Sequence, residues 1–139
     1  MKKRVLVYGN NSYSRPFYKN NEVHFYGFND PLPADLTQFA YVVFTGGEDL
    51  NPELYNEPAH DSVYCNDYRD SLEVALMRTC ILQMVPTVGI CRGMQLQTVL
   101  NGGKLIQDMG HHHNIHEVDT YLNKTVRVNS LHHQLCVPK

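Results

Sequence analysis

Short apolar runs alternate with polar turns along this chain, and each run has the length and composition of a β-strand. The runs are rich in β-branched and aromatic residues, and they end at glycine or at polar positions. The predicted strands are residues 5–8, 23–26, 41–44, 87–90, 104–106 and 125–128. Runs that are apolar at consecutive positions suit parallel strands that are covered on both faces.

Two segments have the spacing of a helix that buries one face. Over residues 68–84, apolar side chains recur three and four positions apart, which predicts a helix with Asp67 as its N-cap and Pro86 beyond its end. A shorter helix is predicted over residues 92–100. The charged residues of the first helix are predicted to form a solvated face: Arg69, Asp70, Glu73 and Arg78. For Arg69, Asp70 and Glu73, contact with the substrate is the alternative.

The order of these elements predicts an α/β fold, a three-layer, doubly wound and mostly parallel sheet in one domain over residues 1–139. Ligands bind such sheets at the carboxyl ends of the strands. The two most unusual loops of the chain, Thr45-Gly46-Gly47 and Cys91-Arg92-Gly93, both follow predicted strands. We therefore expect the functional site where these loops meet.

The composition and charge of the chain limit the kinds of partner that it is expected to bind. The 139 residues carry a net charge of -2, without a basic tract that would favour nucleic acid or an anionic membrane. No apolar segment approaches the ~20 residues of a membrane helix, and the N-terminus lacks a signal-peptide core, so we expect a cytoplasmic protein. The four cysteines are scattered, which does not suggest a disulfide framework.

The cysteine loop has the spacing of a nucleophile elbow. Cys91 lies two residues after Gly89 and two before Gly93, between a predicted strand and a predicted helix. At a helix N-terminus the pKa of the thiol is expected to fall, and the Arg92 amide is placed to bind an oxyanion. Thr45-Gly46-Gly47 is expected to supply the second amide donor. The alternative is a small buried cysteine between turn glycines.

Four blocks in order resemble a known superfamily: FTGGEDLNPELYNE, NDYRDSLEVAL, PTVGICRGMQLQTVLNGGKLIQD and VNSLHHQ. They are similar to the class I glutamine amidotransferase-like proteins, and most similar to the peptidase C26 group, which includes γ-glutamyl-γ-aminobutyrate hydrolase. The resemblance implies a flavodoxin-like fold. It also implies Cys91 as the nucleophile and the amides of Gly47 and Arg92 as oxyanion donors. The substrate-binding residues expected from the same match are Gly46, Gln95, Ser130 and His132.

The resemblance is incomplete at one point. The family's general base is a histidine in a later His-Pro-Glu segment, and no such segment occurs up to Lys139. We therefore expect a domain shortened at its C-terminus. His132 or His133 are candidate substitutes for the base. A partner subunit or a second copy that completes the site is the other possibility.

The histidine cluster around residue 111 invites a metal hypothesis, because His112 and His116 could share a helical face. The surrounding Gly110 and Asn114 favour a loop, so neither a metal nor another cofactor is expected.

Three functions remain open from the sequence. The first is a cysteine hydrolase of γ-glutamyl amides, with a small-molecule γ-glutamyl substrate that passes through a thioester on Cys91. The second is a glutaminase or amidotransferase subunit that supplies ammonia to a partner synthetase. The third is a catalytically silent binding or assembly domain.

Overall fold

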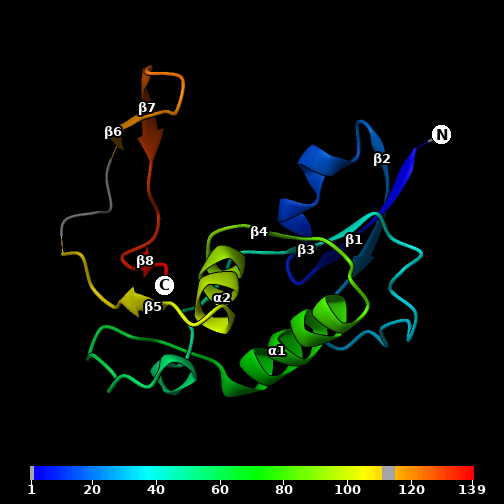
Figure 1. Ribbon diagram of the computed structural model, residues 1–139, viewed down its shortest axis with the longest axis horizontal. Coiled ribbons are helices and arrows are strands. Elements are labelled where there is room, and N and C mark those ends of the chain that lie inside the picture. Colours follow the sequence, from blue (N-terminus) through cyan, green and yellow to red (C-terminus); the bar gives the residue numbers. More distant parts are fainter. Residues whose placement is uncertain (1, 111–114) are drawn as a thin grey trace.

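Four parallel strands form the central sheet, in the order β2-β1-β3-β4 (Figure 1). The structure is a computed structural model that describes residues 2–110 and 115–139. The α-helices and 3-10 helices are η1 (Asn11–Tyr13), η2 (Arg15–Phe17), η3 (Pro52–Tyr55), α1 (Asp67–Leu82) and α2 (Arg92–Leu100). The strands are β1 (Lys3–Tyr8), β2 (Asn21–Tyr26), β3 (Tyr41–Phe44), β4 (Thr87–Gly89), β5 (Lys104–Ile106), β6 (Ile115–Asp119), β7 (Thr125–Asn129) and β8 (Leu135–Val137).

The strand order is that of a flavodoxin-like sheet, with the chain moving outward from β1 first to one side and then to the other. The register pairs Val5 with Val23, and Phe44 with Gly89. The α/β class with a parallel sheet is confirmed, and so are the first four predicted strands and both predicted helices. This register brings the carboxyl ends of β3 and β4 together, as the predicted site requires.

Both α-helices pack on the same face of the sheet. Alternate residues of β1 and β3 point toward them, because successive side chains of a strand point to opposite faces. Leu6 and Phe44 are fully buried there, in one cluster with Leu76 of α1 and Leu96 of α2. Each buried side chain of this size contributes about 2 kcal/mol to folding. The helices are therefore held by the central strands, and they in turn fix the loops that follow those strands.

The opposite face of the sheet has a thinner cover. Val5, Val7 and Val43 form a second buried cluster, and Phe17 of η2 packs against it. The two 3-10 helices that follow β1 thus cover the face that α1 and α2 leave open (Figure 1).

The first turn of α1 differs from the prediction. Asn66, not Asp67, is the N-cap: it has an extended backbone, and its side chain accepts a hydrogen bond from the Arg69 amide at 3.2 Å. Asp67 is the first helical residue and instead accepts a hydrogen bond from the Asn51 side chain at 2.8 Å. The cap lies one residue earlier because asparagine fits that position as well as aspartate does.

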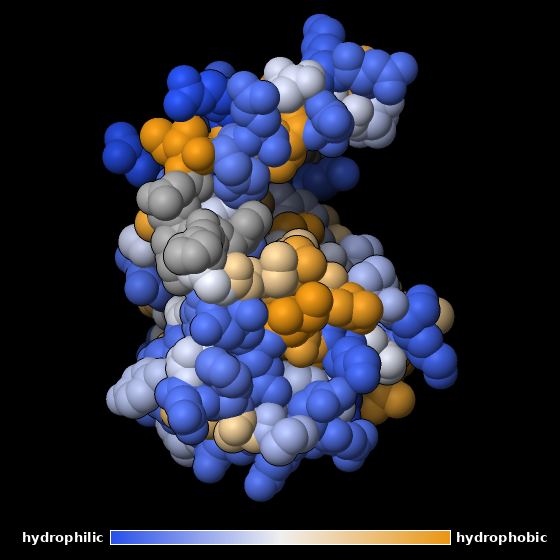
Figure 2. Space-filling model, turned by 90° about the vertical axis from the view of Figure 1, so that its left-hand side faces the viewer, coloured by the Kyte–Doolittle hydropathy of each residue, from blue (hydrophilic) through white to orange (hydrophobic). Residues whose placement is uncertain are grey.

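The strands after α2 do not join the central sheet. β5 pairs with β8, and β6 pairs with β7, each pair antiparallel. The β6–β7 hairpin projects away from the sheet in Figure 1, and most of its residues are exposed. Figure 2 shows this side of the molecule, where the projecting part is mostly hydrophilic and hydrophobic surface gathers below it. Residues 104–106 form a strand as predicted, but this strand pairs antiparallel with β8 and does not join the parallel sheet as the apolar pattern suggested.

Within the described residues, no helix combines the length and the apolar character needed to cross a bilayer. The single domain and the cytoplasmic location stay predictions from the sequence.

Candidate active site

Cys91 lies at a sharp turn between β4 and α2. Its backbone has φ 51° and ψ -108°, a combination that L-residues seldom adopt. The Cys91 carbonyl accepts hydrogen bonds from the amides of Met94 at 3.0 Å and Gln95 at 3.1 Å, so the helix starts directly behind it. The side chain is partly exposed. The thiol is thus held on a strained strand-to-helix turn and is not packed within the hydrophobic core.

The two glycines around Cys91 are explained by close backbone contacts. A Cβ at Gly93 would lie 2.3 Å from the carbonyl oxygen of Phe44, and a Cβ at Gly89 would lie 2.3 Å from the amide nitrogen of Met94. Neither backbone atom can move aside as the end of a side chain could. The spacing of glycines seen in the sequence therefore reflects a turn that packs directly on β3 and on its own helix.

The glycine loop after β3 lies next to this turn. The Ile90 amide donates to the Phe44 carbonyl at 3.0 Å, and the next residues of that strand end are Thr45, Gly46 and Gly47. Gly46 is buried and Gly47 is exposed. The tertiary structure therefore brings together the two loops that the sequence analysis selected.

The thiol of Cys91 differs from the prediction in its acidity. Burial raises its pKa above the ordinary value, and the nearby Asp49 charge acts in the same direction. A hydrogen bond from the Arg92 backbone amide favours the thiolate but does not outweigh burial. The predicted fall in the pKa was wrong, because the partly buried turn desolvates the sulfur.

The charged residues at the start of α1 are not a solvated face, so this prediction was also wrong. Arg69 is 5% exposed, Asp70 is 3% exposed and Glu73 is 0% exposed. They lie between the helix and the two loops, together with the side chain of Arg92, which is also 0% exposed. Only Arg78, two turns further along, matches the expected solvent exposure.

These four side chains form a buried network of ion pairs. Arg92 is paired with both Asp70 and Glu73, and Arg69 Nε lies 3.1 Å from Glu73 Oε1. Burial, and then the charge of Arg69, lowers the pKa of Arg92 to about 10. Burial also raises the pKa of Asp70. Arg92 nevertheless keeps its proton at neutral pH, where the network holds together.

The sequence analysis gave Arg69 only as an alternative substrate contact and did not predict that it binds the glycine loop. Its guanidinium donates to the Gly46 carbonyl at 2.9 Å, pairs with Glu48 and lies over the Phe28 ring, 4.6 Å from the centroid. The available signal was the Arg-Asp-x-x-Glu block, which places Arg69 and Glu73 one helical turn apart. Amphipathic spacing alone misread it, because buried ion pairs have the same pattern as a solvated face.

Gln95 is turned inward on the first turns of α2. It is 4% exposed. This places a buried polar side chain one helical turn after Cys91.

The loop after β7 reaches the same region. Ser130 is 5% exposed, and His133 Nε2 lies 3.1 Å from a carboxylate oxygen of Asp49, just after the glycine loop. The other ring nitrogen of His133 faces Asp108 at 4.0 Å, and His132 Nδ1 contacts the carbonyl oxygen of Gln134 at 2.8 Å. His133 therefore fastens this loop to the end of β3, with both ring nitrogens directed at carboxylates.

Some of the histidines in the metal hypothesis lie outside the residues that the structure describes. His111, His112 and His113 fall in the gap between residues 110 and 115, and His116 lies in strand β6 instead of a helix. In the part of the chain that the structure covers, no three His, Cys, Asp or Glu side chains group as metal ligands. The expectation that no metal is bound stays a prediction.

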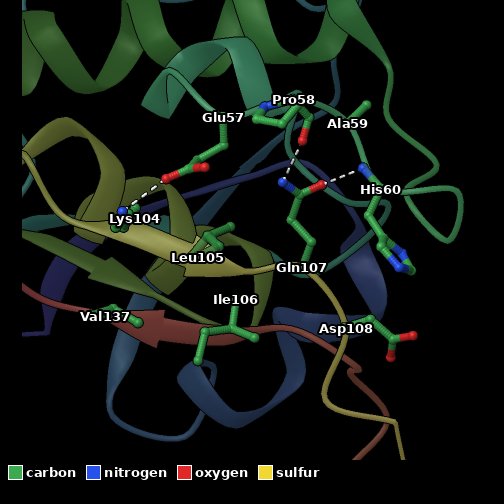
Figure 3. Close-up of a pocket in the computed structure, with 10 residues that line it drawn as sticks. All are labelled: Glu57, Pro58, Ala59, His60, Lys104, Leu105, Ile106, Gln107, Asp108 and Val137. Carbon is green, nitrogen blue, oxygen red and sulfur yellow. Dashed lines mark hydrogen bonds and ion pairs between the residues drawn. The ribbon is translucent and has the colours of Figure 1, made fainter.

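A cavity of about 500 Å³ opens beside β5, and its lining does not include Cys91 (Figure 3). The Gln107 side chain closes one wall by donating to the Pro58 carbonyl and accepting from the His60 amide, both at 2.8 Å. Lys104 and Glu57 form an ion pair at 2.8 Å on another side. These contacts fasten the loop after η3 to β5 and to Gln107. The cavity therefore lies where these two segments pack against each other.

The sequence places the chain in a family. The model of the peptidase C26 family matches residues 30–123, which is more than half of the chain. The chain therefore belongs to this family, within the class I glutamine amidotransferase-like superfamily. The resemblance noted in the sequence is confirmed.

Two relatives show how far the similarity extends. The putative glutamine amidotransferase-like protein YvdE homolog of Lactococcus lactis subsp. cremoris is 33% identical over 134 residues, covering 75% of this chain and 71% of its own. The carbamoyl phosphate synthase small chain of Wigglesworthia glossinidia brevipalpis is 24% identical over 155 residues, covering 99% of this chain and 38% of that protein. The chain spans between 36% and 71% of the length of its first curated relatives.

A solved structure supports the fold. The crystal structure of a glutamine amidotransferase from Thermotoga maritima, tm1158, superposes with a TM-score of 0.68 at 18% identity, covering 99% of this chain and 64% of that one. At this level of identity the comparison supports the fold alone. It agrees with the flavodoxin-like sheet described above.

Proposed function

We propose that this chain carries the nucleophile and the oxyanion loops of a cysteine-dependent hydrolase of γ-glutamyl amides. The observation that carries the proposal is the position of Cys91: a strained, partly exposed thiol at a helix N-terminus, beside a glycine loop. Membership of the peptidase C26 family supports a hydrolase or an amidotransferase of this kind.

The proposed reaction follows from these positions. The Cys91 thiolate attacks the γ-carbonyl carbon, and the oxygen that becomes negative is bound by the amides of Gly47 and Arg92. The C–N bond then breaks, the amine leaves with a proton, and water hydrolyses the resulting γ-glutamyl thioester to glutamate and free thiol. Because burial raises the pKa of Cys91, the thiol requires a base to lose its proton.

The glutamyl group is proposed to be held from two sides. Gln95 offers its inward-turned amide from α2, and Ser130 and His132 lie on the loop that His133 fastens to Asp49. We do not assign His133 itself to proton transfer, because its ring nitrogens face Asp49 and Asp108. The base is proposed to come from the family's His-Pro-Glu segment or from a partner subunit.

A glutaminase that delivers ammonia to a partner is the second candidate. The similarity to the carbamoyl phosphate synthase small chain favours it, since that protein is by name one chain of a larger synthase. The two candidates share Cys91 and differ in the leaving group.

The test is glutamate release by the full protein from γ-glutamyl-γ-aminobutyrate and from glutamine. Cys91→Ser is expected to lower kcat at least about 1,000-fold, as removal of a nucleophile does. Cys65→Ser, a change of the same kind at a partly exposed cysteine, is the matched control and leaves kcat unchanged. Preference for glutamine would support the glutaminase, and full activity of Cys91→Ser would exclude both. Ligand binding without turnover would identify a silent binding domain.

A further inference from the structure

The guanidinium of Arg69 uses all three of its nitrogens. Nε lies 3.1 Å from Glu73 Oε1, Nη1 is paired with Glu48, and Nη2 donates to the Gly46 carbonyl oxygen at 2.9 Å. A planar guanidinium held at two carboxylates has a fixed orientation. The Gly46 carbonyl is therefore bound to a rigid donor.

Fixing this carbonyl also fixes the next amide. The Gly46 carbonyl and the Gly47 amide belong to one peptide group, which is planar and trans, so the C=O and N–H bonds point in opposite directions. Arg69 holds the carbonyl on the buried side, and the Gly47 amide consequently points away from Arg69. A carbonyl that accepts a charged hydrogen bond also strengthens the N–H of the same peptide as a donor.

The glycine at position 47 has a second explanation in this contact. A Cβ built on Gly47 would lie 1.8 Å from Arg69 Nη1. The residue must therefore lack a side chain for the guanidinium to reach Gly46. Gly47 and Arg69 form one unit, although they are 22 positions apart in the sequence.

The same network reaches the second predicted donor. Glu73 pairs with Arg69 through Oε1 and with Arg92 through Oε2, and Arg92 is paired with Asp70 as well. The Arg92 amide is the one next to Cys91. Two successive turns of α1 thus hold both the glycine loop and the cysteine turn.

The charges show that the network acts through geometry. Two guanidiniums face three carboxylates, those of Glu48, Asp70 and Glu73, so the network supplies no excess of positive charge for an oxyanion. Its members are almost completely buried apart from Glu48, whose side chain is 36% exposed.

We propose that Arg69 is a positioning residue that orients the Gly46–Gly47 peptide, so that the Gly47 amide points into the oxyanion site. Glu73 couples this orientation to the cysteine turn through Arg92. The inference rests on the proposed function for its consequence in turnover, and on the geometry of the loop for the orientation itself.

The test compares Arg69→Lys with Arg78→Lys, the same change at an exposed arginine of the same helix. Lysine keeps the charge but cannot make three contacts in one plane. Arg69→Lys is expected to lower kcat about 30-fold, less than the ~100-fold or more for a deleted oxyanion donor, with KM within about 3-fold. Alkylation of Cys91 by iodoacetamide forms no oxyanion, so its rate should change less than about 3-fold.

A second variant controls for the possibility that Arg69→Lys disturbs the fold. Glu48→Gln weakens only the partly exposed contact to Arg69 Nη1, and we expect kcat to fall about 3-fold to 10-fold, again without a change in KM. Parallel losses in kcat, substrate affinity and alkylation rate in both variants would mean that Arg69 supports the fold in general, which would overturn the proposal. Equal kcat in Arg69→Lys and Arg78→Lys would overturn it too.

An NMR measurement that does not depend on turnover tests this inference separately from the proposed function. In 15N-labelled protein, Arg69→Lys should shift the Gly47 amide resonance, because the Gly46–Gly47 peptide loses its fixed orientation and its charged hydrogen bond, and Arg78→Lys should not shift it. If the wild-type protein releases no glutamate, the proposed hydrolase fails, and this measurement still decides the orientation. An unchanged Gly47 amide would overturn the positioning role in either case.

Discussion

Cys91 shows how one side chain is subject to opposing effects. The start of a helix and the Arg92 amide favour the thiolate, whereas burial disfavours it, and burial is the larger effect. The strained backbone of Cys91 gives the thiol its position, but its surroundings keep it protonated. A nucleophile in this state is activated only when a base approaches it.

The acidity of Cys91 leads to a pH prediction. The rate of its alkylation by iodoacetamide should reach half of its maximum at a higher pH in the folded protein than in the urea-unfolded chain, because only the thiolate reacts. The measurement is mass spectrometry of the Cys91 peptide across a pH series. The part of folding stability linked to this thiol is present below its unfolded pKa and is lost as the pH rises through the folded value. A midpoint below that of the unfolded chain would contradict burial as the dominant effect.

Helix α1 has two functions along its length. Its first turns carry the buried network that contacts both loops, and its later turns pack Leu76, Met77 and Cys80 into the core. A helix that starts at a defined residue is required for this, because a shift of one position would turn Arg69 and Glu73 away from the loops.

The start of α1 can be tested through its cap. Asn66→Ala should lower the free energy of unfolding by about 1 kcal/mol, because the Arg69 amide loses its hydrogen-bond acceptor. Asp67→Ala should cost less, about 0.5 kcal/mol, since Asp67 contributes only its charge near the helix N-terminus and an exposed hydrogen bond from Asn51. Urea denaturation followed by circular dichroism measures both. The reverse order of the two costs would favour Asp67 as the cap.

The buried charges join three segments that are far apart in the sequence. Glu73 in α1 is 0% exposed and pairs with Arg69 and with Arg92 at the start of α2. Arg69 in turn contacts the loop after β3 through Glu48 and the Gly46 carbonyl. Buried ion pairs contribute less to net stability than their number suggests, but the loss of one partner leaves an uncompensated charge. Folding and site geometry are therefore coupled through one carboxylate.

This coupling predicts a large loss of stability for a change of one atom. Glu73→Gln should lower the free energy of unfolding by about 3 kcal/mol, because Arg69 and Arg92 then face each other without the shared carboxylate. Glu53→Gln, an exposed glutamate on η3, is the control and should change stability by less than about 0.5 kcal/mol. Urea unfolding at neutral pH measures both variants. Similar losses in the two would show that the network does not stabilise the fold.

Sequence patterns by themselves determined the local features of this protein. The apolar runs predicted the strands of the central sheet, the helical spacing predicted α1 and α2, and the glycines around Cys91 predicted a sharp turn. These predictions succeed because strand, helix and turn preferences act between residues that are close in the chain.

Only the tertiary structure decided the rest. Whether Arg69 and Glu73 are solvated or buried depends on Gly46, Glu48 and Arg92, which lie on other segments, and the acidity of Cys91 depends on how those segments bury it. The antiparallel pairing of β5 with β8 likewise joins segments that are distant in the chain. Burial and ion pairing are properties of neighbours in space, which a periodic pattern along one segment does not contain.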